Sequence, residues 1–243
     1  MVDIHCHILP QVDDGAKSWE VSLEMCRMAA GDGITHMVAT PHANEVYSYN
    51  REQHASVLEQ LRTRLAGPPD ISLGCDFHFS YENMLQVLSN PAQYTIGNTR
   101  YLLVELSDYS IPRGFPEHLD QLMAAGLRPV ITHPERNPLL QSRPEQLLDW
   151  ASQGAIMQVT ANSLTAHWGR TAQRVARWLL DHHAVHVIAS DAHDLDHRPP
   201  LLSPAYRTLC KWKDEAVALA LLEQNPGAIV RDEDLPYFPQ PER

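Results

Sequence analysis

Short apolar segments alternate with longer amphipathic segments along the whole chain. The apolar segments are partly β-branched and are bounded by polar, Gly or Pro residues, which is typical of buried parallel strands. This pattern predicts strands at residues 2–4, 34–39, 71–75, 101–106, 129–132, 155–159 and 184–189. The segments between them predict helices at residues 18–30, 53–65, 116–125, 144–153, 171–182 and 204–224, and Gly33, Gly126 and Gly154 lie where helices are expected to end.

The alternation of strands and helices predicts an α/β fold with a parallel sheet. Seven strands with helices between them favour a barrel or a doubly wound sheet. We find no repeat and no linker, so residues 1–243 are expected to form a single domain. The stretch from residue 226 onward is rich in Pro and is expected to loop over the surface.

The net charge of −11 disfavours nucleic acid or an anionic membrane as a partner. No apolar stretch approaches the roughly 18 residues of a membrane span, so no membrane insertion is expected. The N-terminal residues lack the features of a signal peptide, which predicts a cytoplasmic protein. Cys6, Cys26, Cys75 and Cys210 form no CxxC pair, so they are expected to be reduced thiols rather than zinc ligands.

Side chains that bind metals follow most of the predicted strands. In parallel α/β folds the C-terminal strand ends lie on one face, so these side chains should converge. Mixed imidazole and carboxylate ligands suit manganese, iron or zinc, and several carboxylates allow two or more neighbouring ions. In chain order the candidates are His5 and His7, Asp13 and Asp14 in the next loop, His42, Asp76 with His78 two positions further on, Glu105, His133, and Asp191 with His193, while the sixth strand offers none.

Each candidate has an ordinary explanation when taken alone. His42 suits a helix cap or a core position, Glu105 a salt-bridged strand end, and Asp191 a helix cap. Their coincidence across six strand ends favours a metal site. The other histidines lack this placement and are assigned to the surface or the core, with the role of His78 left open: His36, His54, His118, His167, His182, His183, His186 and His197.

The order of these motifs resembles the PHP (polymerase and histidinol phosphatase) superfamily. The opening HCH motif followed by Asp13-Asp14-Gly15, together with His133-Pro134-Glu135-Arg136, is most similar to one branch. That branch comprises the bacterial manganese-dependent protein-tyrosine phosphatases of capsule and exopolysaccharide synthesis. The motifs run from residue 3 to residue 193, so the resemblance covers most of the chain.

The resemblance implies a distorted barrel of seven β/α units with the active site at the C-terminal ends of the strands. It implies two or three divalent ions, manganese in this branch, with iron or zinc also suited to the same ligands. Matched by motif, these ligands would be His5, His7, Asp14, His42, Asp76, Glu105, His133, Asp191 and His193. Arg136 would bind the phosphate with help from Arg198, and His42 or His193 would protonate the leaving group. The implied substrate is a phosphotyrosine protein, a bacterial tyrosine autokinase.

One motif departs from the branch, which usually has Gly-x-Glu after the third strand. Here the sequence is Gly74-Cys75-Asp76, and the aspartate is one methylene shorter. Asp76 would therefore sit closer to a bridging position or bind one ion only, and His78 could compensate. The metal count and the substrate both depend on this position.

Several other functions remain open on the sequence. A histidinol-phosphate phosphatase would have the same cluster in a smaller, closed pocket. An amidohydrolase also opens with HxH, but usually bridges its metals with a modified lysine where this chain has Glu105. A PHP nuclease is also possible, but this acidic chain offers no obvious basic surface for DNA. A non-catalytic metal-binding regulator is the minority alternative. A cysteine-based phosphatase is excluded, because no cysteine has Arg six positions later.

Overall fold

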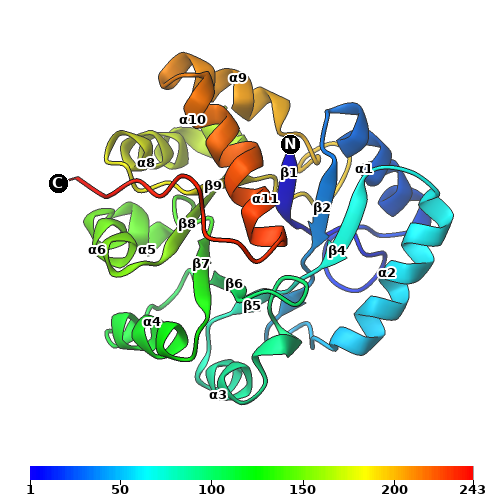
Figure 1. Cartoon of the computed structure of the whole chain (residues 1–243), viewed down its shortest axis with the longest axis horizontal. Helices are drawn as coiled ribbons and strands as arrows, with labels where there is room; N and C mark the ends of the chain where they lie inside the picture. Colours follow the sequence, from blue (N-terminus) through cyan, green and yellow to red (C-terminus); the bar gives the residue numbers. More distant parts are fainter. Residues whose placement is uncertain (243) are drawn as a thin grey trace.

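The computed structural model describes residues 1–242 and shows parallel strands surrounded by helices (Figure 1). Three strands form one parallel sheet in the order β1-β2-β4, and six form a second in the order β3-β5-β6-β7-β8-β9. The strands are β1 (Val2–Cys6), β2 (His36–Ala39), β3 (His42–Ala43), β4 (Asp70–Leu73), β5 (Asp76–His78), β6 (Tyr101–Glu105), β7 (Arg128–Thr132), β8 (Ile156–Thr160) and β9 (Val187–Ala189).

The two sheets are parts of one ring. Only residues 40–41 separate β2 from β3, and only residues 74–75 separate β4 from β5, so these are two interrupted strands. At the other side, Cys6 forms a parallel bridge with Ala192, and the amide of Asp191 donates to the carbonyl oxygen of His5 at 2.8 Å. The nine strands therefore correspond to the seven predicted segments, and the predicted α/β barrel-like fold with parallel strands is confirmed.

Most predicted helices are present. The described helices are α1 (Trp19–Gly31), α2 (Arg51–Leu65), α3 (Tyr81–Ser89), η1 (Pro91–Gln93), α4 (Phe115–Ala124), α5 (Pro138–Gln141), α6 (Glu145–Gln153), α7 (Ala161–Leu164), α8 (Gly169–Asp181), α9 (Ser203–Trp212), α10 (Glu215–Leu219), η2 (Ala220–Gln224) and α11 (Asn225–Val230). The predicted helix at 204–224 is divided, because Asp214 caps a new helix by accepting from the amide of Val217.

The prediction of a surface loop from residue 226 onward is wrong for its first residues, which belong to helix α11. Pro226 lies in the first turn of α11, where a helix needs no amide hydrogen from it. Ile229 of this helix is fully buried and packs with Ile4 and Val187 of the strands. Helix α11 therefore covers the end of the strand ring that is nearer the viewer in Figure 1.

The inward-facing positions of the strands change from apolar to polar toward the C-terminal ends. Apolar inward residues such as Leu103 of β6 and Ile156 of β8 belong to one buried cluster. Because a strand repeats every two residues, the next inward positions are Glu105 and Gln158. The same step leads from Ala189 to Asp191. The fold therefore places a polar layer above an apolar layer, at the face where the candidate ligands lie.

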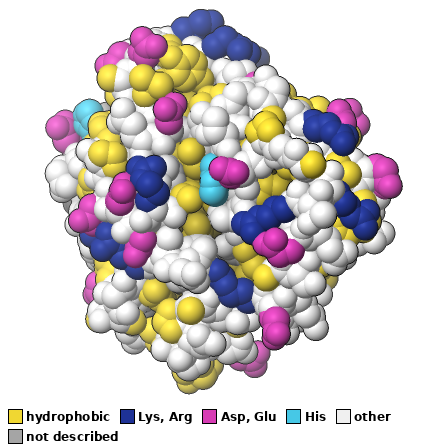
Figure 2. All heavy atoms as spheres, turned by 45° about the vertical axis from the view of Figure 1, so that its right-hand side comes forward, with side chains coloured by type: hydrophobic (Ala, Val, Ile, Leu, Met, Phe, Trp, Pro, Cys, Tyr) yellow, Lys and Arg dark blue, Asp and Glu magenta, His cyan; other side chains and the backbone are white. Residues whose placement is uncertain are grey.

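Charged side chains do not form a track of one sign on the face drawn in Figure 2. Lys and Arg side chains are interspersed there with Asp and Glu. That face therefore offers no continuous basic surface for a nucleic acid backbone. In the described residues, no helix combines the length and the apolar character that a membrane span requires.

Buried His186 is expected to make folding sensitive to acid. Its Nδ1 accepts from the amide of Met157 at 3.0 Å, its ring packs on Phe238, and burial lowers its pKa to about 4. Because the folded-state pKa lies below the unfolded value near 6.5, this stability is present above pH 6.5 and is lost as pH falls toward 4. Between about pH 7.5 and 5.5, the free energy of unfolding of the wild-type protein, measured with urea, should fall by about 1 kcal/mol more than that of His186→Asn.

The matched control for this test is His167→Asn, since His167 is exposed. Its loss of stability between the two pH values should equal that of the wild-type protein. An equal loss in His186→Asn would show that the buried ring does not resist protonation.

Candidate metal centre

The predicted ligands converge at the C-terminal ends of the strands. Seven of the nine fall into three overlapping groups whose ligand atoms lie within 4.8 Å of one another. His7, His42 and Asp76 each belong to two of these groups. The groups are His7, Asp14, His42 and His193; His5, His7 and Asp76; and His42, Asp76 and Glu105.

His5 and His7 face each other through their Nε2 atoms at 3.3 Å. Nδ1 of His5 lies 2.8 Å from Oε1 of Gln158, and Nδ1 of His7 lies 2.7 Å from Oδ2 of Asp13. Because an oxygen acceptor requires the proton on Nδ1, both Nε2 atoms present lone pairs in the neutral rings. Lone pairs facing each other in this way would repel, and either a proton or a metal cation between the two nitrogens would remove that repulsion.

Asp13 contacts a candidate ligand, His7, although the resemblance assigned it no role. Its Oδ1 accepts from the amide of Gly15 at 3.0 Å, while its Oδ2 orients His7. A Cβ atom on Gly15 would lie 2.1 Å from the carbonyl oxygen of His7, so only Gly allows the loop this close. The Asp-Asp-Gly sequence therefore supplies one candidate ligand, Asp14, and one residue that orients another.

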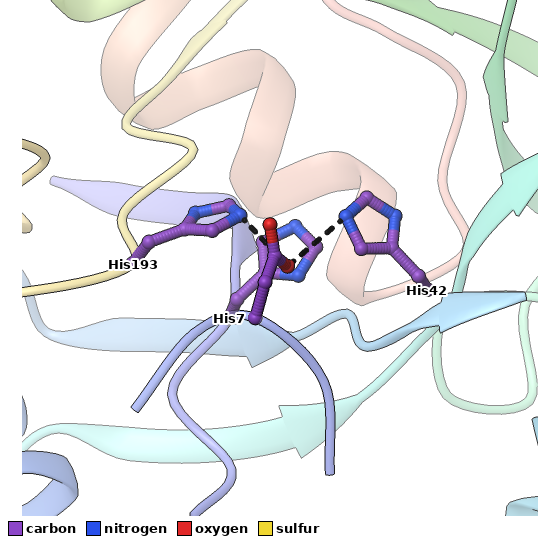
Figure 3. Close-up of side chains that lie close together, drawn as sticks. His7, His42 and His193 are labelled. Atoms are coloured by element: carbon purple, nitrogen blue, oxygen red, sulfur yellow. Dashed lines mark ion pairs between the residues drawn. The ribbon is translucent and has the colours of Figure 1, made fainter. Parts of the chain in front are cut away.

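His42 and His193 approach Asp14 from opposite sides. Nε2 of each ring lies 3.4 Å from Oδ1 of Asp14, and Figure 3 shows both rings and His7 turned toward a shared carboxylate. Nδ1 of His193 lies 3.1 Å from the carbonyl oxygen of Asp191, which assigns the ring proton to Nδ1. Its buried Nε2 then has no hydrogen-bond partner among the described residues.

Asp76 is the fully buried carboxylate of the cluster. Its Oδ2 lies 3.2 Å from Nδ1 of His42 and 3.6 Å from Nε2 of His5, and forms no hydrogen bond in the described part of the chain. Burial opposes its charge, but His5 and His42 hold the pKa of Asp76 well below its usual range. The shorter side chain therefore reaches the positions of two groups, despite the missing methylene.

The pKa values of the imidazoles diverge with their surroundings. Burial would lower the pKa of His5, but Asp76 and Asp191 outweigh it and raise the pKa to about 9. Burial is likewise outweighed at His42, where Asp14 and Asp76 raise the pKa to about 11. Burial and the neighbouring His193 lower the pKa of His7 to about 4. The negative field around His5 and His42 that favours a proton would equally favour a metal cation.

Glu105 and His133 lie at the edge of the three groups. Oε1 of Glu105 is 3.6 Å from Nε2 of His133, and its Oε2 is 3.4 Å from Nδ1 of His78. Burial and the charge of Asp76 raise the pKa of Glu105, whereas burial and Arg136 lower the pKa of His133. His78 therefore contacts a candidate ligand, and its part in metal binding stays a prediction.

Asp191 joins the histidine cluster to the two arginines. Its Oδ1 lies 3.4 Å from Nε2 of His5 and 3.6 Å from Nε2 of His7. Its Oδ2 accepts from Nη1 of Arg136 and, at 2.6 Å, from Nη2 of Arg198. The arginines predicted to bind phosphate thus lie directly beside the predicted metal ligands.

Two candidate ligands have backbone conformations that non-glycine residues seldom adopt. The φ angle is +35° at His133 and +53° at Asp191. Such conformations cost of order 1–3 kcal/mol and persist where the surrounding structure requires them. His133 directly follows β7 and Asp191 lies two residues after β9, so both unusual conformations occur where the chain leaves a strand beside the cluster.

Two buried residues support the site in roles that the sequence did not indicate, although Glu135 belongs to the His133-Pro134-Glu135-Arg136 motif. Gln158 occupies the sixth strand, which was expected to offer no ligand, and it orients His5 instead. Glu135 accepts from the amide of Thr160 at 3.0 Å and from Oγ of Ser163 at 2.6 Å. It therefore fixes the loop that carries His133 and Arg136. Their partners are distant in sequence, so only the fold reveals these roles.

The donor set fits divalent cations. Imidazole nitrogens and carboxylate oxygens suit manganese, iron or zinc. Buried Nδ1 of His42, Nε2 of His193 and Oδ2 of Asp76 have no hydrogen-bond partner within residues 1–242, although buried polar atoms are usually paired. Cations would satisfy all three, and the arginine pair beside them suits a phosphoryl group.

The sequence and the fold both have known relatives. Residues 1–231 match the family model described as "Capsular polysaccharide synthesis, CpsB/CapC". The chain is similar to tyrosine-protein phosphatase YwqE of Bacillus subtilis, with 34% identity over 82% of this chain and 79% of the relative. It is also similar to tyrosine-protein phosphatase CpsB of Streptococcus pneumoniae, with 29% identity over 96% and 99% of the two chains.

Solved structures extend the similarity to the whole chain. A chain from the crystal structures of YwqE from Bacillus subtilis and CpsB from Streptococcus pneumoniae, described as unique metal-dependent tyrosine phosphatases, matches with a TM-score of 0.93. The identity is 32%, and 100% of both chains is covered. A β-aspartyl dipeptidase from Fervidobacterium islandicum matches with a TM-score of 0.61 at 16% identity, which shows a shared fold alone.

Proposed function

Because the chain belongs to the CpsB/CapC family of capsular polysaccharide synthesis, we propose that it is a metal-dependent protein-tyrosine phosphatase. The observation that carries this proposal is the position of Asp191. One of its carboxylate oxygens faces the histidine cluster and the other binds Arg136 and Arg198. A candidate cation site and a candidate phosphate site therefore share one side chain.

The metal site in this proposal holds two or three divalent ions. Its ligands are His5, His7, Asp14, His42, Asp76, Glu105, His133, Asp191 and His193. Three overlapping ligand groups support as many as three ions, and the mixed donors support manganese, with iron or zinc as substitutes. Ions bound there would lower the pKa of bound water and neutralise charge on phosphoryl oxygens.

The arginines bind and orient the substrate in this mechanism. Arg136 and Arg198 are about one fifth exposed, and each gives Asp191 only part of its five donors. The remaining donors would bind the phosphoryl oxygens and orient the phosphoryl group for in-line attack. Whichever of His42 and His193 is not fully engaged as a metal ligand would deliver a proton to the tyrosyl oxygen. Since a phenol has a pKa near 10, the demand for that proton is modest.

The shape of the cavity favours a protein substrate over a small phosphoester. The cavity beside the cluster has a volume of about 700 Å³ and is lined by His42, Arg136, Val46 and Tyr109 among others. Val46 is 78% exposed and Tyr109 is 94% exposed. Exposed apolar side chains at the cavity can contact a tyrosine ring and the peptide on either side of it. A pocket that encloses histidinol phosphate would not need such exposed side chains.

The substrate in the cell is part of the same proposal. We assign it as a phosphorylated bacterial tyrosine autokinase that acts in polysaccharide synthesis. The four cysteines are free thiols, which supports a reducing compartment and hence a cytoplasmic site of action.

A substrate panel tests the proposed function. Protein loaded with Mn²⁺ should hydrolyse a phosphotyrosine peptide and p-nitrophenyl phosphate with kcat/KM at least ~10²-fold above that for histidinol phosphate, because phenolate leaves more readily than an alkoxide. Phosphate release measured in parallel gives the three values. A preference for histidinol phosphate would replace the proposal with a small-molecule phosphatase. No turnover of any phosphoester would favour a non-catalytic regulator.

A further inference from the structure

Trp168 contacts both arginines of the candidate phosphate site. The guanidinium carbon of Arg136 lies 3.8 Å from the centroid of the indole, and that of Arg198 lies 5.3 Å from it. Trp168 lies in the connection between α7 and α8, immediately before Gly169, and it lines the same cavity as Arg136. An aromatic face within about 6 Å attracts a cation through its quadrupole.

The indole is not placed there for its own hydrogen bonding. Its Nε1 is buried and has no hydrogen-bond partner among the described residues. A buried indole N–H usually finds an acceptor, and leaving it unpaired is unfavourable for stability. The location of the indole is therefore better explained by the stacking of the guanidinium groups on its ring.

Within the described part of the chain, the two guanidinium groups otherwise hydrogen-bond to a single oxygen atom. Both donate to Oδ2 of Asp191, while Oδ1 of that carboxylate faces His5 and His7. Two like charges on one oxygen repel each other, and Asp191 is also a proposed metal ligand. An uncharged platform beneath both side chains would restrict their rotamers without competing for their N–H donors, which stay available for a phosphoryl group.

We propose that Trp168 is a positioning residue that holds Arg136 and Arg198 in the geometry that binds the phosphoryl group. This proposal rests on the proposed phosphatase function and adds a residue that acts through the arginines. Trp168 itself need not touch the phosphoryl group. The ring face is the required feature, so Phe should replace Trp and an aliphatic residue should not.

The test uses full-length protein loaded with Mn²⁺, with inorganic phosphate as the binding probe and p-nitrophenyl phosphate as the substrate. Trp168→Leu should raise the inhibition constant of phosphate and KM by about tenfold, with kcat and the bound metal changed less than about twofold. Trp168→Phe should stay within about threefold of the wild-type values. Trp19→Leu is the matched control, because it removes another arginine stack, that of Arg64 at 4.1 Å, away from the site.

Equal phosphate inhibition in wild type and Trp168→Leu would overturn the proposal, as would equal losses in the Leu and Phe variants. If Trp168→Leu fails to fold, the change in tryptophan fluorescence on adding phosphate to the wild type and to Trp168→Phe tests the proposal instead. Phosphate should change the emission of the wild-type protein and leave Trp168→Phe nearly unchanged, and an identical change in both would overturn the proposal. Phosphate binding can be measured without turnover. A wild-type protein whose phosphate binding depends on Trp168, but which does not hydrolyse phosphotyrosine, would therefore contradict only the proposed function.

Discussion

Asp76→Asn should lower kcat/KM at least ~10³-fold while leaving the fold intact. Asp76 is fully buried, belongs to two of the three ligand groups, and carries a pKa held well below its usual range. Asn keeps the shape of the side chain but removes a full negative charge from the cluster. Metal content should fall together with activity, and steady-state kinetics with elemental analysis of the same sample measures both.

The matched control for Asp76→Asn is Asp70→Asn. Asp70 is an exposed residue at the start of β4 and takes no part in the ligand groups. It should keep wild-type activity and metal content. Asp76→Glu restores the residue usual in the resembled branch and should retain bound metal. Full activity in Asp76→Asn with unchanged metal content would remove Asp76 from the proposed ligands.

Arg136→Ala should lower kcat/KM by about 10²- to 10³-fold, because it removes charge-assisted hydrogen bonds to the phosphoryl group. Arg136→Lys should recover only part of this loss, since an ammonium group cannot reproduce the planar fork of the guanidinium. Metal content should stay near the wild-type value in both variants. Kinetics with a phosphotyrosine peptide and elemental analysis test this prediction.

The control for Arg136→Ala is Arg113→Ala, an exposed arginine outside the lining of the candidate active-site cavity. It should keep wild-type kinetics. Loss of the bound metal in Arg136→Ala would instead indicate that the arginine acts by supporting Asp191. An unchanged kcat/KM in Arg136→Ala would exclude it from phosphate binding.

The convergence of the candidate ligands could be predicted because it follows from two periodic rules. Strands alternate every two residues, and the C-terminal ends of parallel strands meet at one face. Glu105 follows inward-facing Leu103, and Asp191 follows inward-facing Ala189, so their positions were predictable from short local patterns. The candidates at the strand ends were therefore recognisable before any of their contacts were known, and the resemblance to the PHP superfamily selected the nine ligands among them.

The supporting residues could not be predicted because their roles depend on partners far along the chain. Gln158 orients His5 across 153 positions, and nothing near Gln158 distinguishes it from an ordinary strand residue. Trp168 meets Arg136 and Arg198 only after three separate loops come together. Asp13 is the exception, since the adjacent Gly15 and its nearness to His7 in the sequence could have indicated a role.

The errors in the fold have local physical causes. Pro226 suggested an end to helical structure, but in the first turn of a helix Pro costs nothing, and burial of Ile229 stabilises α11. Helix α3 was missed although its signals are local, since Ser80 caps it by accepting from the amide of Asn83, and Met84 and Val87 form its buried face. Tertiary packing decides such short helices more than their own sequence does.

The most direct test of the central claim is anomalous diffraction from crystals of the protein grown with Mn²⁺. Two or three peaks should lie about 2.0–2.4 Å from nitrogen and oxygen atoms of the cluster formed by His5, His7, His42, Asp76 and Asp191. At least one peak should occupy the space between Nε2 of His5 and Nε2 of His7. A well-ordered cluster without any peak at saturating Mn²⁺, or peaks only elsewhere on the protein, would contradict the account.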